Sequence, residues 1–290
     1  MKASDYIRSK FPGIFILILV GYIAYPPLEA QKSFGSVPEV IPVVTAPPDS
    51  LNLPGFYRKY LNANGIAITA SRRVPDSALT QAWKIISFMT ADLPEDVLKA
   101  MIRVKSRVTV MARYEGTTDV PEHAHLASDT SLNWDVRARG LGGSIKRPLT
   151  SCAEENLLAY QIDKYHAEDI LIHEFAHSIH LIGILQVDRD FNSKLEKLFQ
   201  QAVARGKYAN TYARTNISEY WAEGVQNWFN VNAEVPVPDG KHNRLNTRKE
   251  LKKYDPDLYR LIGQYFSEFK VSPSRSEERR VGKECRSRWS

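Results

Sequence analysis

Residues 167–182 read Ala-Glu-Asp-Ile-Leu-Ile-His-Glu-Phe-Ala-His-Ser-Ile-His-Leu-Ile, and this stretch decides the expected fold. Its apolar residues recur at helical spacing, which predicts an amphipathic helix with one face against a core. These residues are Ile170, Leu171, Phe175, Ile179 and Ile182. Gly183 follows directly and predicts the C-terminal end of the helix.

The same helix carries His173 and His177 at positions i and i+4. Side chains at that spacing stand one turn apart on one face, so the two imidazoles can bind one Zn²⁺. Glu174 lies beside them and can accept a proton from a water that the zinc activates. His180 lies one turn further along this face, and we interpret it as a packing or supporting residue and not as a ligand.

A third ligand would decide the subclass of metal site. The metzincin pattern requires a histidine where this chain has Gly183, so that subclass is disfavoured. A second helix is predicted within residues 212–224, and it carries Glu219 and Glu223 at i and i+4. One carboxylate can complete a tetrahedral site, and the other can hold a ligand histidine by a hydrogen bond. Asn216 begins a glycosylation sequon, but we interpret it as the N-cap of this helix.

The remaining elements predict an α+β fold, because mixed strands precede helices. We expect strands at 65–70 and 107–112, the second of them alternating as a half-buried strand. Helices are expected at 78–89, capped by Asp76, and from Pro94 onward. Three glycines predict a loop or strand edge where backbones approach closely, namely Gly140, Gly142 and Gly143.

The N-terminal part has the pattern of a secretory signal peptide over residues 1–30. Basic residues precede an apolar run at 11–25, which is shorter than the ~20 residues of a membrane-spanning helix. A secreted protein is therefore expected, with an uncleaved N-terminal anchor as the alternative. Residues 31–54 contain five prolines and predict an extended linker before a folded domain at 55–274.

Residues 275–290 resemble the translation of a sequencing-library adapter, and the native C-terminus is then expected to be missing. This stretch holds six basic and three acidic residues, so the formal charge of +6 falls to +3 without it. No nucleic-acid partner is expected from that charge. Cys285 also lies there, which leaves Cys152 alone and excludes an intramolecular disulfide. We interpret Cys152 as a small buried side chain in preference to a thiol nucleophile.

The two helical motifs resemble the gluzincin zinc metallopeptidases, and most closely the catalytic domain of anthrax toxin lethal factor. The matching segments are His173-Glu-Phe-x-His177 and Tyr212-x-Arg-Thr-Asn-x-x-Glu-aromatic-aromatic-Ala-Glu223, within residues 165–225. The resemblance implies a zincin-like domain, with a small mixed sheet packed on the HExxH helix and a helical C-terminal part. The toxin's cell-entry and substrate-docking domains have no counterpart in this chain.

The resemblance also implies a role for each matching residue. His173, His177 and Glu219 would bind zinc. Glu174 would be the general base, Tyr212 would stabilise the oxyanion, and Glu223 would support the ligands from behind.

The expected function is that of a secreted, monomeric, zinc-dependent endopeptidase without a stable membrane span. Its partner would be a peptide or protein substrate that lies as an extra strand along a sheet edge. Two alternatives stay open: a zinc hydrolase of a non-peptide amide, and a non-catalytic wall-associated or binding protein with a structural zinc. The glutamate beside the two histidines argues against the structural role, since a purely structural site does not need that residue. Structural sites also usually close with four protein ligands.

Overall fold

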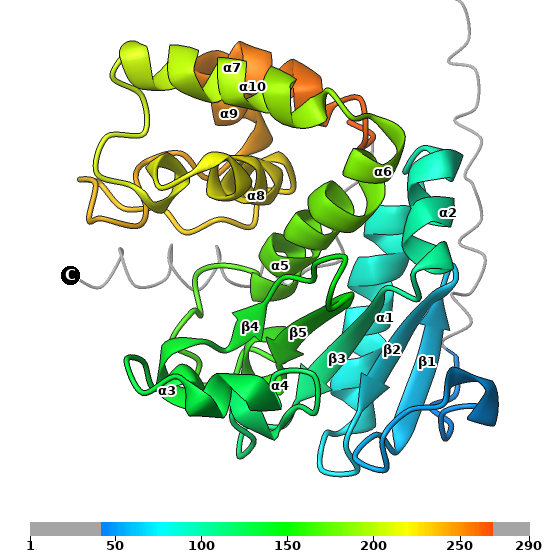
Figure 1. The fold of residues 1–290 in the computed structure, drawn as a ribbon. Helices are drawn as coiled ribbons and strands as arrows, with labels where there is room; N and C mark the ends of the chain where they lie inside the picture. Colours follow the sequence, from blue (N-terminus) through cyan, green and yellow to red (C-terminus); the bar gives the residue numbers. More distant parts are fainter. Residues whose placement is uncertain (1–41, 269–290) are drawn as a thin grey trace, which may run out of the picture. The chain divides into compact units, whose positions relative to one another are not determined.

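The computed structural model describes residues 42–268, which form a mixed five-stranded sheet with helices (Figure 1). The strand order is β1-β2-β3-β5-β4. Strand β1 pairs antiparallel with β2, the pairs β2–β3 and β3–β5 are parallel, and β4 pairs antiparallel with β5. The strand bounds are β1 Lys59–Ala63, β2 Ile66–Ala70, β3 Arg107–Met111, β4 Gly140–Leu141 and β5 Leu149–Ala153. The expected α+β class is confirmed.

The helices form two groups. Those that accompany the sheet are α1 Asp76–Thr90, α2 Glu95–Arg103, α3 Trp134–Arg137, α4 Glu154–Leu157, α5 Ile170–Ser178 and α6 Leu185–Val187. The C-terminal group consists of α7 Phe191–Ala204, α8 Ile217–Trp228, α9 Arg248–Tyr254 and α10 Pro256–Ile262. Helix α5 contacts β5 on one side and α8 on the other, so it lies between the sheet and the C-terminal helices (Figure 1).

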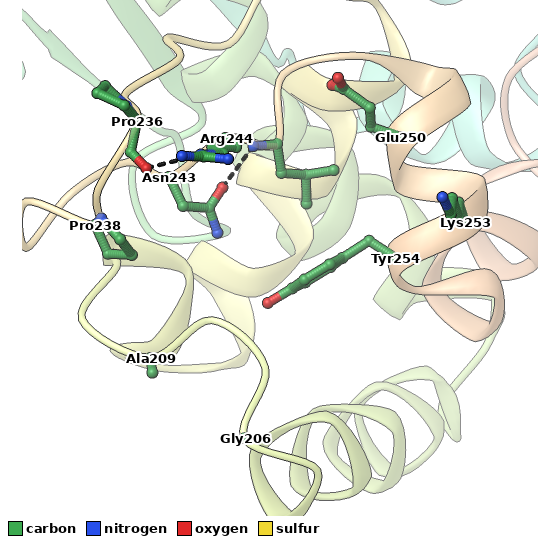
Figure 2. Close-up of a pocket in the computed structure, with 10 residues that line it drawn as sticks. Gly206, Ala209, Pro236, Pro238, Asn243, Arg244, Glu250, Lys253 and Tyr254 are labelled. Carbon is green, nitrogen blue, oxygen red and sulfur yellow. Dashed lines mark hydrogen bonds between the residues drawn. The ribbon is translucent and has the colours of Figure 1, made fainter.

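A cavity of about 680 Å³ opens within the C-terminal part. Its walls are α9, the turn that follows α7, and the segment 236–245 (Figure 2). Arg244 Nε donates to the carbonyl oxygen of Pro236 at 2.8 Å, which fixes the fold of that segment beside Tyr254.

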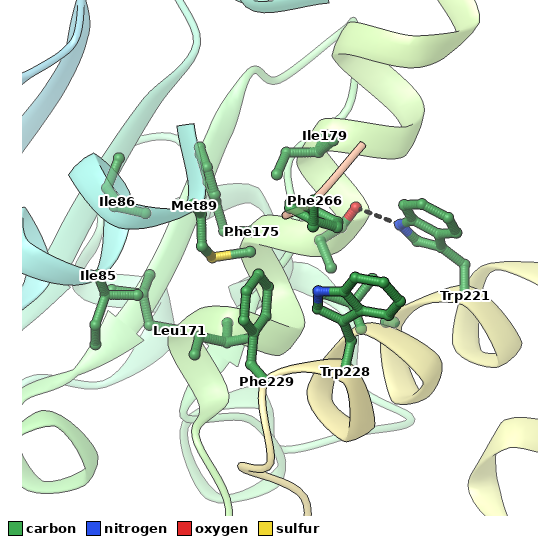
Figure 3. Close-up of a cluster of buried hydrophobic side chains, with 14 of the residues drawn as sticks. Ile85, Ile86, Met89, Leu171, Phe175, Ile179, Trp221, Trp228, Phe229 and Phe266 are labelled. Carbon is green, nitrogen blue, oxygen red and sulfur yellow. Dashed lines mark hydrogen bonds between the residues drawn. The ribbon is translucent and has the colours of Figure 1, made fainter. Parts of the chain in front are cut away.

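The main core lies where α1, α5 and α8 meet (Figure 3). Large apolar side chains from all three helices fill it, among them Ile85, Ile86, Met89, Leu171, Phe175, Ile179, Trp221 and Trp228. Trp221 Nε1 donates to the carbonyl oxygen of Ala176 at 3.0 Å. Since burial of large apolar side chains is the main stabilising contribution to a fold, this core fixes α8 against α5.

Strand β3 differs from the expected half-buried alternation. Four of its five residues are buried, and β2 and β5 beside it are buried throughout. Val108 and Val110 belong to the main core, whereas Met111 packs with Val120 in a second cluster. Successive side chains point to opposite faces, so β3 is covered on both, as central parallel strands usually are.

Gly183 does not end the long helix, so that prediction was wrong. Helix α5 begins at Ile170, where Asp169 Oδ1 accepts the Ile172 backbone N–H at 3.0 Å. It continues as a π-helical turn over Ile179–Ile184 and then as α6. A Cβ at Gly183 would come within 2.7 Å of Val97 Cγ1. The glycine therefore allows α2 to pack closely against this helix.

Asp76 is not the cap of α1, which is a second correction. Pro75 occupies the N-cap position, and no side chain caps the helix there. Asp76 lies in the first turn, and its carboxylate accepts from Lys59 Nζ at 2.6 Å. The ion pair between Asp76 and Lys59 therefore links the start of α1 to β1.

Part of the expected linker is ordered against the domain. Thr45 forms a two-way backbone bridge with Tyr60 in β1, and Val44 packs on the main core. Residues 42–54 thus contact the domain, and they include a short 3-10 turn at Asp49–Leu51. The predicted signal peptide, the rest of the linker and the adapter-like stretch at 275–290 lie outside the described residues.

Among residues 42–268, the stretch Ile170–Val187 alone is long and apolar enough to cross a membrane. Most of it is buried inside the domain as the central helix of the core.

Candidate metal centre

Helices α5 and α8 bring three of the predicted ligands together. His173 Nε2 lies 3.1 Å from Glu219 Oε2 and 3.2 Å from His177 Nε2. His177 Nε2 lies 3.3 Å from the same carboxylate oxygen. Three donor atoms thus form a nearly equilateral triangle, and the group could hold a metal ion.

The size of the triangle fits a small tetrahedral ion. Donor atoms bonded at about 2.0–2.1 Å in tetrahedral geometry lie about 3.3 Å apart. The three measured separations are 3.1, 3.2 and 3.3 Å. The set therefore fits three corners of a tetrahedron and leaves the fourth corner for a non-protein ligand.

The electrostatics of the group also favour a cation between these atoms. Desolvation lowers the pKa of His173, but the surrounding carboxylates, Glu219 first, outweigh it and raise the pKa to about 10. Burial raises the pKa of Glu219, but hydrogen bonds from the two histidines outweigh it and hold that pKa well below its usual range. A positive charge is thus stabilised here. A bound metal ion would supply that charge in place of protons.

Gln226 orients His173, and the sequence interpretation did not include it. Gln226 Oε1 lies 2.8 Å from His173 Nδ1, whereas Glu223 Oε1 lies 3.8 Å away. The sequence interpretation assigned the hydrogen bond to His173 to a glutamate carboxylate, but the Gln226 amide makes it. Gln226 follows Glu219 and Glu223 at i+7 and i+3 on the same helical face, and this spacing was the available signal.

Glu223 belongs to a second group with Glu168 and His242, in which the two carboxylates are buried and His242 is half-buried. Glu223 Oε2 accepts from Asn232 at 2.8 Å. Glu168 pairs with His242 at 3.5 Å and also accepts from Gln226 Nε2 at 3.3 Å. This group could also hold an ion. The hydrogen bond from Gln226 to Glu168 also fixes the Gln226 side chain, which in turn orients His173.

The edge strand β4 runs close beside the ligand helix. A Cβ at Gly142 would come within 2.6 Å of His177 Cβ, and one at Gly140 within 3.0 Å of Glu174 Cγ. Only glycine allows this approach. The expectation of a glycine-rich strand edge with close backbone contact is confirmed.

Tyr212 lies on the open side of the ligands. Its ring stacks on the ring of His173 with centroids 6.3 Å apart. Burial raises the pKa of Tyr212 to about 12, so the hydroxyl keeps its proton and can donate a hydrogen bond. Asn216 caps α8 as expected, since its side chain accepts from the backbone N–H groups of Ser218 and Glu219.

His180 and Cys152 do not join the three ligands. His180 is buried, its Nε2 bonds Asn192 at 2.7 Å, and its ring packs edge-on against Phe191. Burial lowers the pKa of His180 to about 4. Cys152 is buried in the main core, and burial raises the pKa of its thiol well above the usual range. Both residues are packing groups.

The ligands open into a cleft of about 1070 Å³. Glu174, Tyr212 and the ligands line it, together with α3 and β4. The smaller cavity of Figure 2 lies beside α9, and the residues that line it include no histidine or cysteine. The candidate metal ligands therefore line the larger cleft.

Comparison with known proteins adds no relative: no family model, no curated protein and no solved structure matches this chain.

Proposed function

We propose that this chain is a zinc-dependent endopeptidase with a zincin-like domain of the gluzincin type. The observation that carries the proposal is the triangle of His173, His177 and Glu219, with separations of 3.1–3.3 Å and a fourth corner facing the cleft. Two imidazoles and one carboxylate are a donor set that suits Zn²⁺, and catalytic zinc sites keep one position free of protein ligands.

The residues around the metal position have roles that fit peptide hydrolysis. A bound Zn²⁺ would supply Lewis acidity and lower the pKa of a water. Glu174 accepts the proton of the attacking water and delivers it to the leaving amine nitrogen as the C–N bond breaks. The hydroxyl of Tyr212 donates to the oxygen that becomes negative when the carbonyl carbon is attacked.

The edge strand supports an extended peptide as substrate. Strand β4 ends the described sheet, and it pairs on one side only, with β5. A peptide backbone can pair with the other side as an added strand. The close contacts of Gly140 and Gly142 with the ligand helix would place that peptide beside the metal position. The apolar run at residues 11–25 supports export from the cell.

The test is digestion of a peptide library by the purified full-length protein, with cleavage products read by mass spectrometry. Cleavage should stop when a chelator removes the metal and return when zinc is added. A zinc-loaded protein that leaves peptides intact but hydrolyses small acyl amides would instead be a hydrolase of non-peptide amides. Zinc binding without hydrolysis of either class would indicate a structural zinc.

A further inference from the structure

The charges that line the cleft fall into two groups, those with a partner and those without. Three carboxylates are engaged: Glu219 with the histidines, Glu168 with His242, and Glu223 with Asn232. Arg139 is also engaged, since it forms a bidentate pair with Glu155. These charged groups already have partners within the protein, so they are not available to bind a substrate.

Two cations on the cleft wall are not engaged in this way. Arg137 and Lys241 are both exposed, and both line the cleft. Within residues 42–268, neither side chain forms an ion pair with a carboxylate. These two side chains can therefore pair with an anionic group of a bound ligand.

Both cations border the reacting position. The Lys241 carbonyl oxygen accepts the backbone N–H of Tyr212 at 2.8 Å, so the segment that carries Lys241 is fixed to Tyr212. The Arg137 guanidinium lies beside the Tyr212 hydroxyl and opposes the rise in its pKa. Arg137 also precedes β4 by three positions, at the end of the strand along which a peptide would lie.

We infer that Arg137 and Lys241 select substrates with a carboxylate close to the scissile bond. This inference rests on the proposed peptidase function. A guanidinium presents a planar fork that matches a carboxylate, and an ammonium adds a second positive charge. The carboxylate can be an aspartate or glutamate side chain, or the C-terminus of a short peptide.

The experiment compares matched quenched-fluorescence peptides that are cleaved by the full-length protein. Each pair differs only by Glu or Gln at one position beside the scissile bond, and each peptide is made with a free and with an amidated C-terminus. Wild type should favour the acidic member by about tenfold in kcat/KM. If the terminal carboxylate is the group recognised, the free acid should be favoured over the amide by a similar factor.

Variants assign the preference to the two cations. Arg137→Gln and Lys241→Gln should each bring the acid-to-amide ratio toward one, and salt should weaken the wild-type ratio. Lys249→Gln is the matched control, because Lys249 is exposed on α9 and does not line the cleft. It should keep the wild-type ratio.

A binding measurement separates this inference from the proposed function. Fluorescence anisotropy with labelled acidic and amide peptides should show tighter binding of the acidic one to wild type, and equal binding to Arg137→Gln. Equal binding and equal turnover of both peptides by wild type would overturn the selectivity while leaving the peptidase intact. Selective binding of the acidic peptide with no cleavage of any peptide would refute the proposed peptidase function. It would still support Arg137 and Lys241 as a binding site for acidic peptides.

Discussion

Gln226 Oε1 lies 2.8 Å from Nδ1 of His173, and this contact decides which ring nitrogen faces the other candidate ligands. The amide nitrogen of Gln226 donates to the Asp169 carbonyl oxygen at 3.1 Å and to Glu168 at 3.3 Å. The amide oxygen must therefore face the histidine, which donates from Nδ1. In the neutral ring, Nε2 then directs its lone pair toward the metal position.

Replacement of Gln226 tests this orientation directly. Gln226→Leu keeps a similar volume but removes the acceptor, and we expect zinc affinity to fall about 10- to 100-fold. The affinity is measured by competition with a chromophoric chelator. Unchanged affinity in a folded Gln226→Leu protein would show that packing alone orients the ring.

The three ligands should each be needed for zinc. His173→Ala, His177→Ala and Glu219→Ala should lose the one zinc per chain that elemental analysis should find in wild type. His166→Ala is the control, since His166 is exposed and does not line the cleft. Full occupancy in Glu219→Ala would require a different third ligand.

Glu174→Gln removes the proposed base but keeps the shape of the side chain. Zinc content and melting temperature should stay as in wild type, while kcat/KM for peptides should fall by about 10²–10⁴. Glu196→Gln, on the exposed side of α7, should have no effect. Near-normal turnover of Glu174→Gln would refute the mechanism.

Tyr212→Phe tests the oxyanion donor. The hydroxyl is proposed to meet charge that exists only in the transition state, so kcat should fall by about 10²–10³ with KM within a fewfold. Tyr160→Phe, outside the cleft, is the matched control. A higher KM with kcat unchanged would instead place the hydroxyl on the bound substrate.

Gly142→Ala tests the close approach of the edge strand. The new Cβ would come within 2.6 Å of His177 Cβ, so the free energy of unfolding should fall by about 1–3 kcal/mol and zinc should bind more weakly. At Gly55 an added Cβ meets nothing closer than 3.7 Å, and Gly55→Ala should be nearly neutral in thermal denaturation. Equal melting curves for the two variants would contradict the packing argument.

The helices of the site could be predicted from the sequence because spacing alone places residues on a helical face. His173 and His177, and likewise Glu219 and Glu223, needed no knowledge of the rest of the fold. The spacing of residues along the sequence could not predict the distance between α5 and α8. That distance decides that Gln226, and not Glu223, reaches His173, since the two side chains lie on the same face of α8.

The failures at β3 and Gly183 have a common cause. Local patterns assign a residue from its neighbours in sequence, whereas both features are set by elements that pack from elsewhere. Strand β3 is buried because β2 and β5 flank it and packing covers both of its faces. Gly183 serves the contact with α2, so the helix passes through a residue that usually ends one.

The origin of the three ligands in two separate helices has a consequence for the apo protein. His173 and Glu219 are 46 residues apart in sequence, and an ion between them would fasten the sheet side of the molecule to its C-terminal helices. Metal affinity at such a site is part of the folding free energy. Stripping the ion should therefore loosen the C-terminal helices first, and a protease added to the apo protein would find its earliest cuts in the chain between α7 and α8.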